Sequence, residues 1–226
     1  MNRLLLFGKR PRRGKVKTRL VPPLSDEQAL RLYRAFLCDQ LAFLRRFTDV
    51  ADVEWCADGP VSTEEQADLG AEGIPLGLQG PGNLGRRLLR AVDRTSREGA
   101  GATVVIGADS PTLPATHVRK AFRVLEQGAP AVIAPAEDGG YVLVGMRRPL
   151  AELFRGVRWG GSEVADTTRD RAARIDVRLE EIEPWYDIDD IGGLRRLRSE
   201  LSLGDAAERT PATVRALVDL GLPPVV

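Results

Sequence analysis

The chain has 226 residues, of which 43% are hydrophobic and 29% are charged, and its formal net charge is +1. This composition suits one α/β domain with a substantial core, and the neutral balance argues against a general nucleic-acid binder. No apolar run approaches the roughly 20 residues of a membrane span. The two cysteines, Cys38 and Cys56, lack metal-binding spacing and are expected to be buried thiols of a reduced, cytoplasmic protein.

Apolar residues recur with the periods of strands and helices along the whole chain. Residues 3–8 are apolar, end at a glycine and indicate a buried strand. Residues 25–47 predict an amphipathic helix that begins with a capping box of Ser25 and Gln28. Residues 103–106 are typical of a strand buried on both faces. Further strands are predicted at 52–58, 74–79, twice within 130–146, and at 176–182, and further helices at 62–71, 83–99, 115–128, 150–156, 162–174, 190–201 and 211–221.

The alternation of strands and helices predicts an α/β fold, with a mostly parallel sheet covered by helices on both faces. We expect one domain over residues 1–201 and a helical tail over 202–226 that packs on the same domain. The single histidine, His117, is expected to lie exposed in a first helical turn, which argues against histidine-based catalysis.

The loop over residues 9–19 concentrates positive charge after the first predicted strand. Seven of its eleven residues are Lys or Arg, which leaves 26 basic residues against 32 acidic ones elsewhere. A loop in this position lies at the carboxyl edge of the sheet, where open α/β folds bind ligands. Clustered cations need a compensating anion, so the loop favours phosphate binding, although Gly8 and Gly14 are spaced differently from the glycines of a Walker loop. The alternative is a solvated basic turn.

The sequence GPGNLG over residues 80–85 satisfies G-x-G-x-x-G between a predicted strand and a predicted helix. Together with Asp109 it could form a dinucleotide site, in which the carboxylate would bind a ribose hydroxyl. Asn83 instead favours an ordinary turn that ends at a helix N-cap. Both interpretations remain open at this stage.

Carboxylates gather in three segments that follow strands. Asp109 ends the central strand. If its carboxylate faces a phosphate-binding loop, the bound phosphates would repel it unless a divalent cation lay between them. The alternative is a local Asx turn. Asp187 and Asp189 project to one side of an extended segment and suit a metal or a ligand ammonium, or else the start of a helix. Asp138, with Glu137, precedes two glycines that permit close approach to a ligand, and either acid is a candidate base.

These segments together resemble glycosyltransferase-like proteins of the nucleotide-diphospho-sugar transferase superfamily and, more distantly, guanylyltransferases that act on 2-phospho-L-lactate. The resemblance spans roughly residues 3–195. The family pattern K-x-P-x-x-G-x-V-K-T-R-L is matched by Lys9, Pro11, Gly14, Val16, Lys17, Thr18, Arg19 and Leu20. Later matches are LGRR around Gly85, GADSPTL, PAEDGGYVLVGM and WYDID.

The resemblance implies a single Rossmann-like GT-A domain and a role for each matching segment. The nucleotide and its phosphates would contact Gly8, Lys9, Gly14, Lys17, Thr18, Arg19 and Gly85. The metal would be held by Asp109, Asp187 and Asp189, the acceptor would lie beside Gly139, Gly140 and Tyr141, and the catalytic residues would be Lys17, Asp109 and Asp138. The chain departs from the family pattern at Asn83, in the WGGSEV segment over 159–164, and at Asp190 and Ile191 after the DID stretch.

The sequence therefore predicts a transferase that depends on Mg²⁺ or Mn²⁺ and transfers a glycosyl group from a nucleotide-diphospho-sugar to a small-molecule acceptor. A nucleotidylyltransferase that joins an NTP to a phosphorylated acceptor is the close alternative. An NAD(P)-binding oxidoreductase and a non-catalytic nucleotide-binding domain are further alternatives. Neither nucleic acid nor membrane is an expected partner, and homodimerisation stays open.

Overall fold

The structure is a computed structural model that describes residues 1–224, and it is built on one seven-stranded sheet of order β3-β2-β1-β4-β6-β5-β7. Strand β6 runs antiparallel to β4 and β5, whereas all other neighbouring pairs are parallel. The strands are β1 (Asn2–Gly8), β2 (Ala51–Ala57), β3 (Leu76–Leu78), β4 (Thr103–Gly107), β5 (Ala131–Pro135), β6 (Tyr141–Met146) and β7 (Leu179–Glu181). The mostly parallel mixed sheet confirms the predicted fold class.

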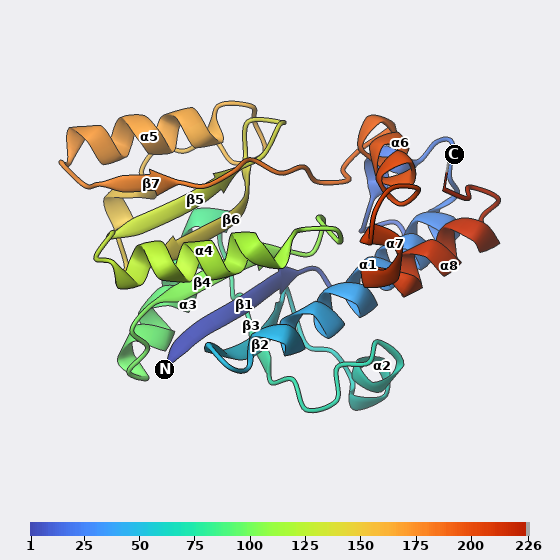
Figure 1. The fold of residues 1–226 in the computed structure, drawn as a ribbon, viewed down its shortest axis with the longest axis horizontal. Coiled ribbons are helices and arrows are strands. Elements are labelled where there is room, and N and C mark those ends of the chain that lie inside the picture. The colour runs from blue at the N-terminus through green and yellow to red at the C-terminus, as the bar shows by residue number, and fades with distance from the viewer. Residues whose placement is uncertain (225–226) are drawn as a thin grey trace.

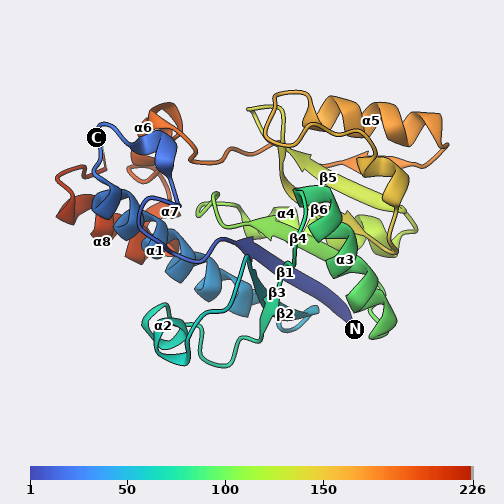
Figure 2. The same ribbon diagram turned by 180° about the vertical axis from the view of Figure 1, so that it is seen from behind.

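Helices cover both faces of the sheet, with α1 and α4 on one face and α3 and α5 on the other (Figures 1 and 2). Strand β1 shows how the sequence places them: Leu4 and Leu6 pack with α1 and α4, while Leu5 and Phe7 face α3, because successive side chains alternate. The helices are α1 (Asp26–Leu44), α2 (Thr63–Asp68), α3 (Leu84–Arg97), α4 (Ala115–Glu126), α5 (Val164–Arg174), α6 (Ile191–Glu200), α7 (Ala206–Arg209) and α8 (Pro211–Asp219), with 3₁₀ turns η1 (Thr18–Leu20), η2 (Arg45–Phe47) and η3 (Ala151–Phe154).

Local signals predicted some element boundaries and missed others. The capping box of Ser25 and Gln28 is present at the start of α1, with both hydrogen bonds formed. Strand β7 is shorter than expected, because Asp176 takes a left-handed turn with φ of 51°. The prediction for His117 was wrong in its exposure: the ring is buried, 5% exposed, and packs edge-on against Trp185.

The last three helices form a third core with the N-terminal half of α1 (Figure 1). Helix α8 packs along α1, and the Asp39 carboxylate of α1 accepts hydrogen bonds from the backbone N–H groups of Ala212 and Thr213 at 3.0 and 2.7 Å. The carboxylate thereby satisfies two free donors in the first turn of α8. Among residues 1–224, no helix has the length and apolarity needed to cross a bilayer.

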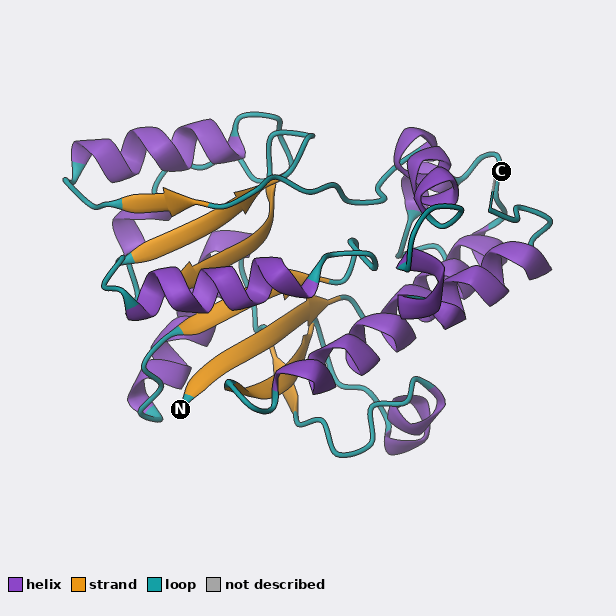
Figure 3. Ribbon diagram, viewed as in Figure 1, coloured by secondary structure: helices purple, strands orange, loops and turns teal. Residues whose placement is uncertain are grey.

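The parallel strands β1, β4 and β5 point their carboxyl ends toward the side on which the C-terminal helices lie (Figure 3). The loops that leave this edge are the basic loop over residues 9–17, the segment 108–114, the β5–β6 turn over 136–140 and the extended segment 182–190. The fold therefore brings all the charged segments singled out in the sequence to one edge of the sheet.

Candidate functional site

Backbone contacts connect the loops at the carboxyl edge. The amide of Ile188 donates to the carbonyl of Asp109 at 2.9 Å, which joins the last acidic segment to the end of β4. Trp185 forms an isolated parallel bridge with Ala136, so the same segment also lies beside the β5–β6 turn. The carboxylates that flank these residues are consequently held on a connected backbone framework.

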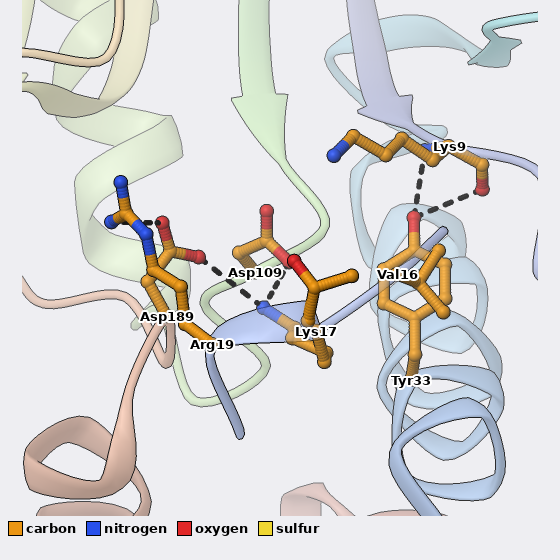
Figure 4. Close-up of a pocket in the computed structure, with 8 residues that line it drawn as sticks. Lys9, Val16, Lys17, Arg19, Tyr33, Asp109 and Asp189 are labelled. Atoms are coloured by element: carbon orange, nitrogen blue, oxygen red, sulfur yellow. Dashed lines mark hydrogen bonds and ion pairs between the residues drawn. The ribbon is translucent and has the colours of Figure 1, made fainter. Parts of the chain in front are cut away.

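Lys17 lies at the centre of this edge (Figure 4). Its side chain is only 3% exposed, and its ammonium forms an ion pair with Asp109 and lies 3.6 Å from the Asp189 carboxylate. The ammonium also donates a hydrogen bond to the carbonyl of Ile188 at 2.8 Å. Three oxygen-bearing groups from two segments thus surround one buried cation.

Tyr33 of α1 fixes the start of the basic loop, a role that the sequence did not reveal. Its hydroxyl accepts a hydrogen bond from the amide of Lys9 at 2.7 Å and donates one to the Lys9 carbonyl at 2.9 Å (Figure 4). Burial, reinforced by the charge of Asp109, raises the pKa of Tyr33 well above its ordinary value, so the hydroxyl keeps its proton. The period of α1 predicted only a core tyrosine at this position.

The other arginines and lysines of the basic loop divide into anchored and exposed groups. The Arg10 backbone amide donates to the Asp58 carboxylate at 2.7 Å, and its guanidinium donates to the Pro60 carbonyl at 3.0 Å, so this residue ties the loop to the end of β2. Arg12, Arg13 and Lys15 are exposed to solvent. A cavity of about 200 Å³ opens beneath the loop and is lined by Lys9, Val16, Lys17, Thr18, Arg19, Tyr33, Asp109 and Asp189.

A carboxylate cluster adjoins this cavity. Asp138, Asp187 and Asp189 each present an oxygen within 4.8 Å of the others, an arrangement of hard oxygen ligands that fits a divalent cation such as Mg²⁺ or Mn²⁺. Burial, together with the nearby charges of Asp189, Asp138 and Asp109, raises the pKa of Asp187 from 3.8 to about 7. Burial also raises the pKa of Asp189. The structure thus brings Asp187 and Asp189 together and adds Asp138, while Asp109 is paired with Lys17.

A second pocket begins where the first ends and shares Arg19 and Asp189 with it. Arg196 of α6 lines this pocket; its guanidinium lies 4.0 Å over the Tyr186 ring and pairs with Glu137. No local pattern in the sequence pointed to Arg196, because it is one of several arginines on an amphipathic helix. The pocket is lined by Arg19, Glu137, Asp138, Tyr186, Asp187, Asp189, Asp190, Gly192, Gly193 and Arg196.

The two glycines and the tyrosine expected on the acceptor side, Gly139, Gly140 and Tyr141, each have defined neighbours in the structure. A Cβ on Gly139 would lie 1.9 Å from the carbonyl oxygen of Ser162, so the space above this glycine is filled by the chain itself. The amide of Gly140 donates to the Asp138 side chain at 2.8 Å. The Tyr141 ring packs edge-on against Trp159 and lines an apolar pocket next to α3, separate from the carboxylate cluster.

The predicted phosphate-contacting glycines also serve packing. A Cβ on Gly8 would meet Leu37 and Trp55 within 3.3 Å, whereas Gly14 takes φ of +68° in the loop turn. A Cβ on Gly85 would lie 2.6 Å from the Trp159 ring, so this glycine admits the indole.

The GPGNLG stretch does not have the surroundings of a dinucleotide site. It follows β3 at the edge of the sheet, and β2 and β1 separate it from β4 and Asp109. Arg90 fills the turn and donates to the carbonyls of Gln79 and Pro81 at 2.6 and 2.9 Å, and Asn83 caps α3 through the amide of Arg86. These contacts support the interpretation as a turn with a helix N-cap.

Solved structures with the same fold include several transferases. A proposed nucleotide-diphospho-sugar transferase from Desulfovibrio desulfuricans G20 is 30% identical, aligns over 98% of this chain and 96% of its own, and has a TM-score of 0.86. A cytidylyltransferase from Leptospira borgpetersenii is 14% identical over 100% of this chain and 98% of its own, with a TM-score of 0.56. A CMP:2-keto-3-deoxy-manno-octonic acid synthetase in complex with CTP is 11% identical over 89% of this chain and 99% of its own, with a TM-score of 0.52. The last two similarities show the fold alone.

The chain is also similar to part of a longer curated protein and matches one family model. RecBCD enzyme subunit RecB from two strains of Mycobacterium tuberculosis is 26% identical over 191 residues, or 82% of this chain, but the chain spans only 15% of the length of that subunit. The model of DUF2064, described as an uncharacterized protein conserved in bacteria, matches residues 44–161, just over half of the chain. With this match, and with a full-length structural relative at 30% identity, the chain belongs to the DUF2064 family and has the nucleotide-diphospho-sugar transferase fold.

Proposed function

We propose that the protein is a divalent-metal-dependent transferase that moves a glycosyl group from a nucleotide-diphospho-sugar to a small-molecule acceptor. The observation that carries the proposal is that the cavity beneath the basic loop shares Asp189 with a cluster of three carboxylates on the carboxyl edge of the sheet. Further support comes from the D. desulfuricans relative, which is 30% identical over nearly the whole chain.

Lys9, Lys17 and Arg19 are the cations of this cavity and would bind the donor diphosphate. Tyr33 orients the start of the loop by holding both backbone polar groups of Lys9, so this part of the loop is fixed before the donor binds. Preorganised positive charge is most effective where negative charge develops in the transition state, here on the leaving diphosphate. The acceptor would enter through the adjoining pocket, which opens beside Asp138 and Arg196.

Asp187 and Asp189, with Asp138 as a third ligand, are the residues that would hold the cation. A divalent cation bound there would neutralise charge on the donor phosphates. Asp109 remains a candidate fourth ligand, because its carboxylate contacts the same Lys17 ammonium as the carboxylate of Asp189. Asp138 is the exposed member of the cluster. When it does not ligate the cation, its carboxylate is the candidate to accept a proton from the acceptor hydroxyl.

Nucleotidyl transfer is the second candidate, and the shared fold of two cytidylyltransferase-type structures favours it. The same basic loop would bind a triphosphate, and the acceptor would carry a phosphate. The two reactions differ in the released group, which is a nucleotide in glycosyl transfer and pyrophosphate in nucleotidyl transfer.

A ligand panel tests the proposal. Thermal shifts are measured with nucleoside diphosphates, nucleotide-sugars, NTPs and NAD(P), each with and without Mg²⁺. Ligand at 100 times its Kd stabilises a protein by about 2.7 kcal/mol, so specific donors give clear shifts. We expect metal-dependent stabilisation by one class of nucleotide-sugar, and release of the nucleoside diphosphate when the acceptor is present.

Asp187→Asn should abolish the metal-dependent part of this shift, because it removes a carboxylate from the cluster at constant size. Glu64→Gln is the matched control, since Glu64 is exposed on α2, away from the carboxylate cluster. Stabilisation by NTP alone with pyrophosphate release would support the second candidate. A shift with NAD(P) and with no other ligand would overturn both.

A further inference from the structure

The cation that the carboxylates require is already supplied by the chain. The Lys17 ammonium pairs with Asp109, lies 3.6 Å from Asp189 and donates to the Ile188 carbonyl at 2.8 Å. The two carboxylates and the carbonyl that surround the ammonium are hard oxygen ligands, and such a set also suits a metal ion. Lys17 therefore lies next to the carboxylate cluster and is at the same time part of the basic loop.

Both the backbone and the surroundings of Lys17 hold the ammonium in this place. Its φ of 49° lies in the left-handed region, which is unfavourable for a residue with a Cβ and persists only where the surroundings enforce it. The ammonium lies 5.5 Å from the centre of the Phe36 ring and 6.0 Å from that of Tyr33. These rings exclude water from one side and leave the carboxylates as the main partners.

A divalent cation in the cluster of Asp138, Asp187 and Asp189 would share the Asp189 carboxylate with this ammonium, and with Asp109 as a fourth ligand it would share that carboxylate too. Two positive charges within a few ångströms repel each other strongly in a site that is largely shielded from water. The Asp109 and Asp189 carboxylates can therefore serve Lys17 or a metal ion, unless a further anion enters to balance the added charge. The phosphates of a donor are that anion.

We infer that Lys17 is an internal counterion that is exchanged for the divalent cation when the donor binds. Without a donor, Lys17 holds Asp109 and Asp189 in position. With a donor, the ammonium turns to the phosphates and the metal takes the carboxylates, so metal and nucleotide bind together and the metal alone binds weakly. This inference rests on the proposed function, and it adds an order of binding to it.

Thermodynamic reciprocity makes the exchange measurable. If the nucleotide strengthens metal binding by a given factor, the metal strengthens nucleotide binding by the same factor. The factor should depend on Lys17, because this side chain is the group that must move. Removal of its charge should strengthen metal binding to the free protein and weaken the cooperation with nucleotide.

The test is a titration of the full chain with Mn²⁺, followed by electron paramagnetic resonance, with and without GDP or UDP. Mn²⁺ bound by free nucleotide is measured separately and subtracted. We expect Lys17→Met to lower the Kd of the nucleotide-free protein for Mn²⁺ by at least about tenfold and to reduce the nucleotide-dependent gain. Lys15→Met removes the same charge from an exposed position of the same loop and should change both values little.

Lys17→Gln serves as a second variant, because its amide can still donate to the Ile188 carbonyl and support the fold. Unchanged or weaker Mn²⁺ binding in both folded Lys17 variants overturns the inference, and so does tight Mn²⁺ binding to the wild-type protein with no gain from nucleotide. Failure of the proposed function looks different: the wild-type protein then binds neither Mn²⁺ nor any nucleotide under any condition.

Discussion

Gly85 and Gly139 lack side chains because other parts of the chain occupy the space that a Cβ would need. At Gly85 the neighbour is the Trp159 ring, and at Gly139 it is the backbone of Ser162. The amide of Ala165 also donates to the Gly139 carbonyl at 2.8 Å. The two glycines thus attach the segment 159–165 to α3 and to the β5–β6 turn, and their effect on the site is exerted through packing.

Gly85→Ala should destabilise the protein by about 1–2 kcal/mol, because the overlap with Trp159 outweighs the gain of about 1 kcal/mol for alanine in a helix. Urea denaturation followed by tryptophan fluorescence measures the change. Gly101→Ala is the control, since the nearest atom to its added Cβ would be 3.4 Å away. Equal stability of the two variants would contradict the packing role of Gly85.

At the scale of elements, the C-terminal helix α8 is attached to α1 by a side chain that caps it from another helix. Asp39 supplies both carboxylate oxygens to the first turn of α8, while the N-cap residue Thr210 makes no capping bond with its own side chain. A cap from a distant residue has no local sequence signature. It therefore could not be found from the spacing rules that predicted the cap of α1.

Asp39→Ala should cost about 1 kcal/mol or more, because one buried and one half-buried backbone donor lose their acceptor. Amide hydrogen exchange should become faster in α8 and remain unchanged in α3. Asp93→Ala removes a comparable carboxylate from an exposed pair with Arg97 and should cost less than about 0.5 kcal/mol. Uniform exchange rates across wild type and Asp39→Ala would show that α8 does not depend on this cap.

The sequence predicted the elements with strong periodicity and the identity of the charged segments. Residues 103–106 became a central strand, and Asp187 and Asp189 came together as alternation in an extended segment requires. Two features escaped prediction for physical reasons. Tyr33 has the same spacing as the core residues of α1, and Arg196 meets Glu137, which lies 59 positions earlier in the chain. His117 was misjudged because its burial depends on Trp185, which lies 68 residues later in the chain.

At the scale of the whole molecule, the carboxylate cluster affects stability in the absence of metal. The pKa of Asp187 in the folded protein is raised from 3.8 to about 7, so the folded state binds a proton more tightly than the unfolded state does. At about pH 4 and below, the proton bound by Asp187 makes its full contribution to the free energy of unfolding. This contribution is lost as the pH rises from about 4 to about 7.

We expect the free energy of unfolding of the protein in EDTA to fall more steeply with rising pH than that of Asp187→Asn, which cannot titrate at this position. Urea denaturation at pH 5 and pH 8 gives the difference, and saturating Mg²⁺ with nucleotide should reduce it. Parallel pH profiles of the two proteins would mean that Asp187 titrates near its ordinary pKa.

The antiparallel strand β6 has a consequence for how members of this family can vary. In a purely parallel sheet, each strand leaves the carboxyl edge through a loop that can lengthen freely before its helix. Here β5 returns directly as β6, so residues 136–140 form a hairpin turn held at both ends by strand pairing. Asp138 is thus carried by the least extensible connection of the edge. We expect relatives to differ in length at residues 147–163 and to keep this turn constant.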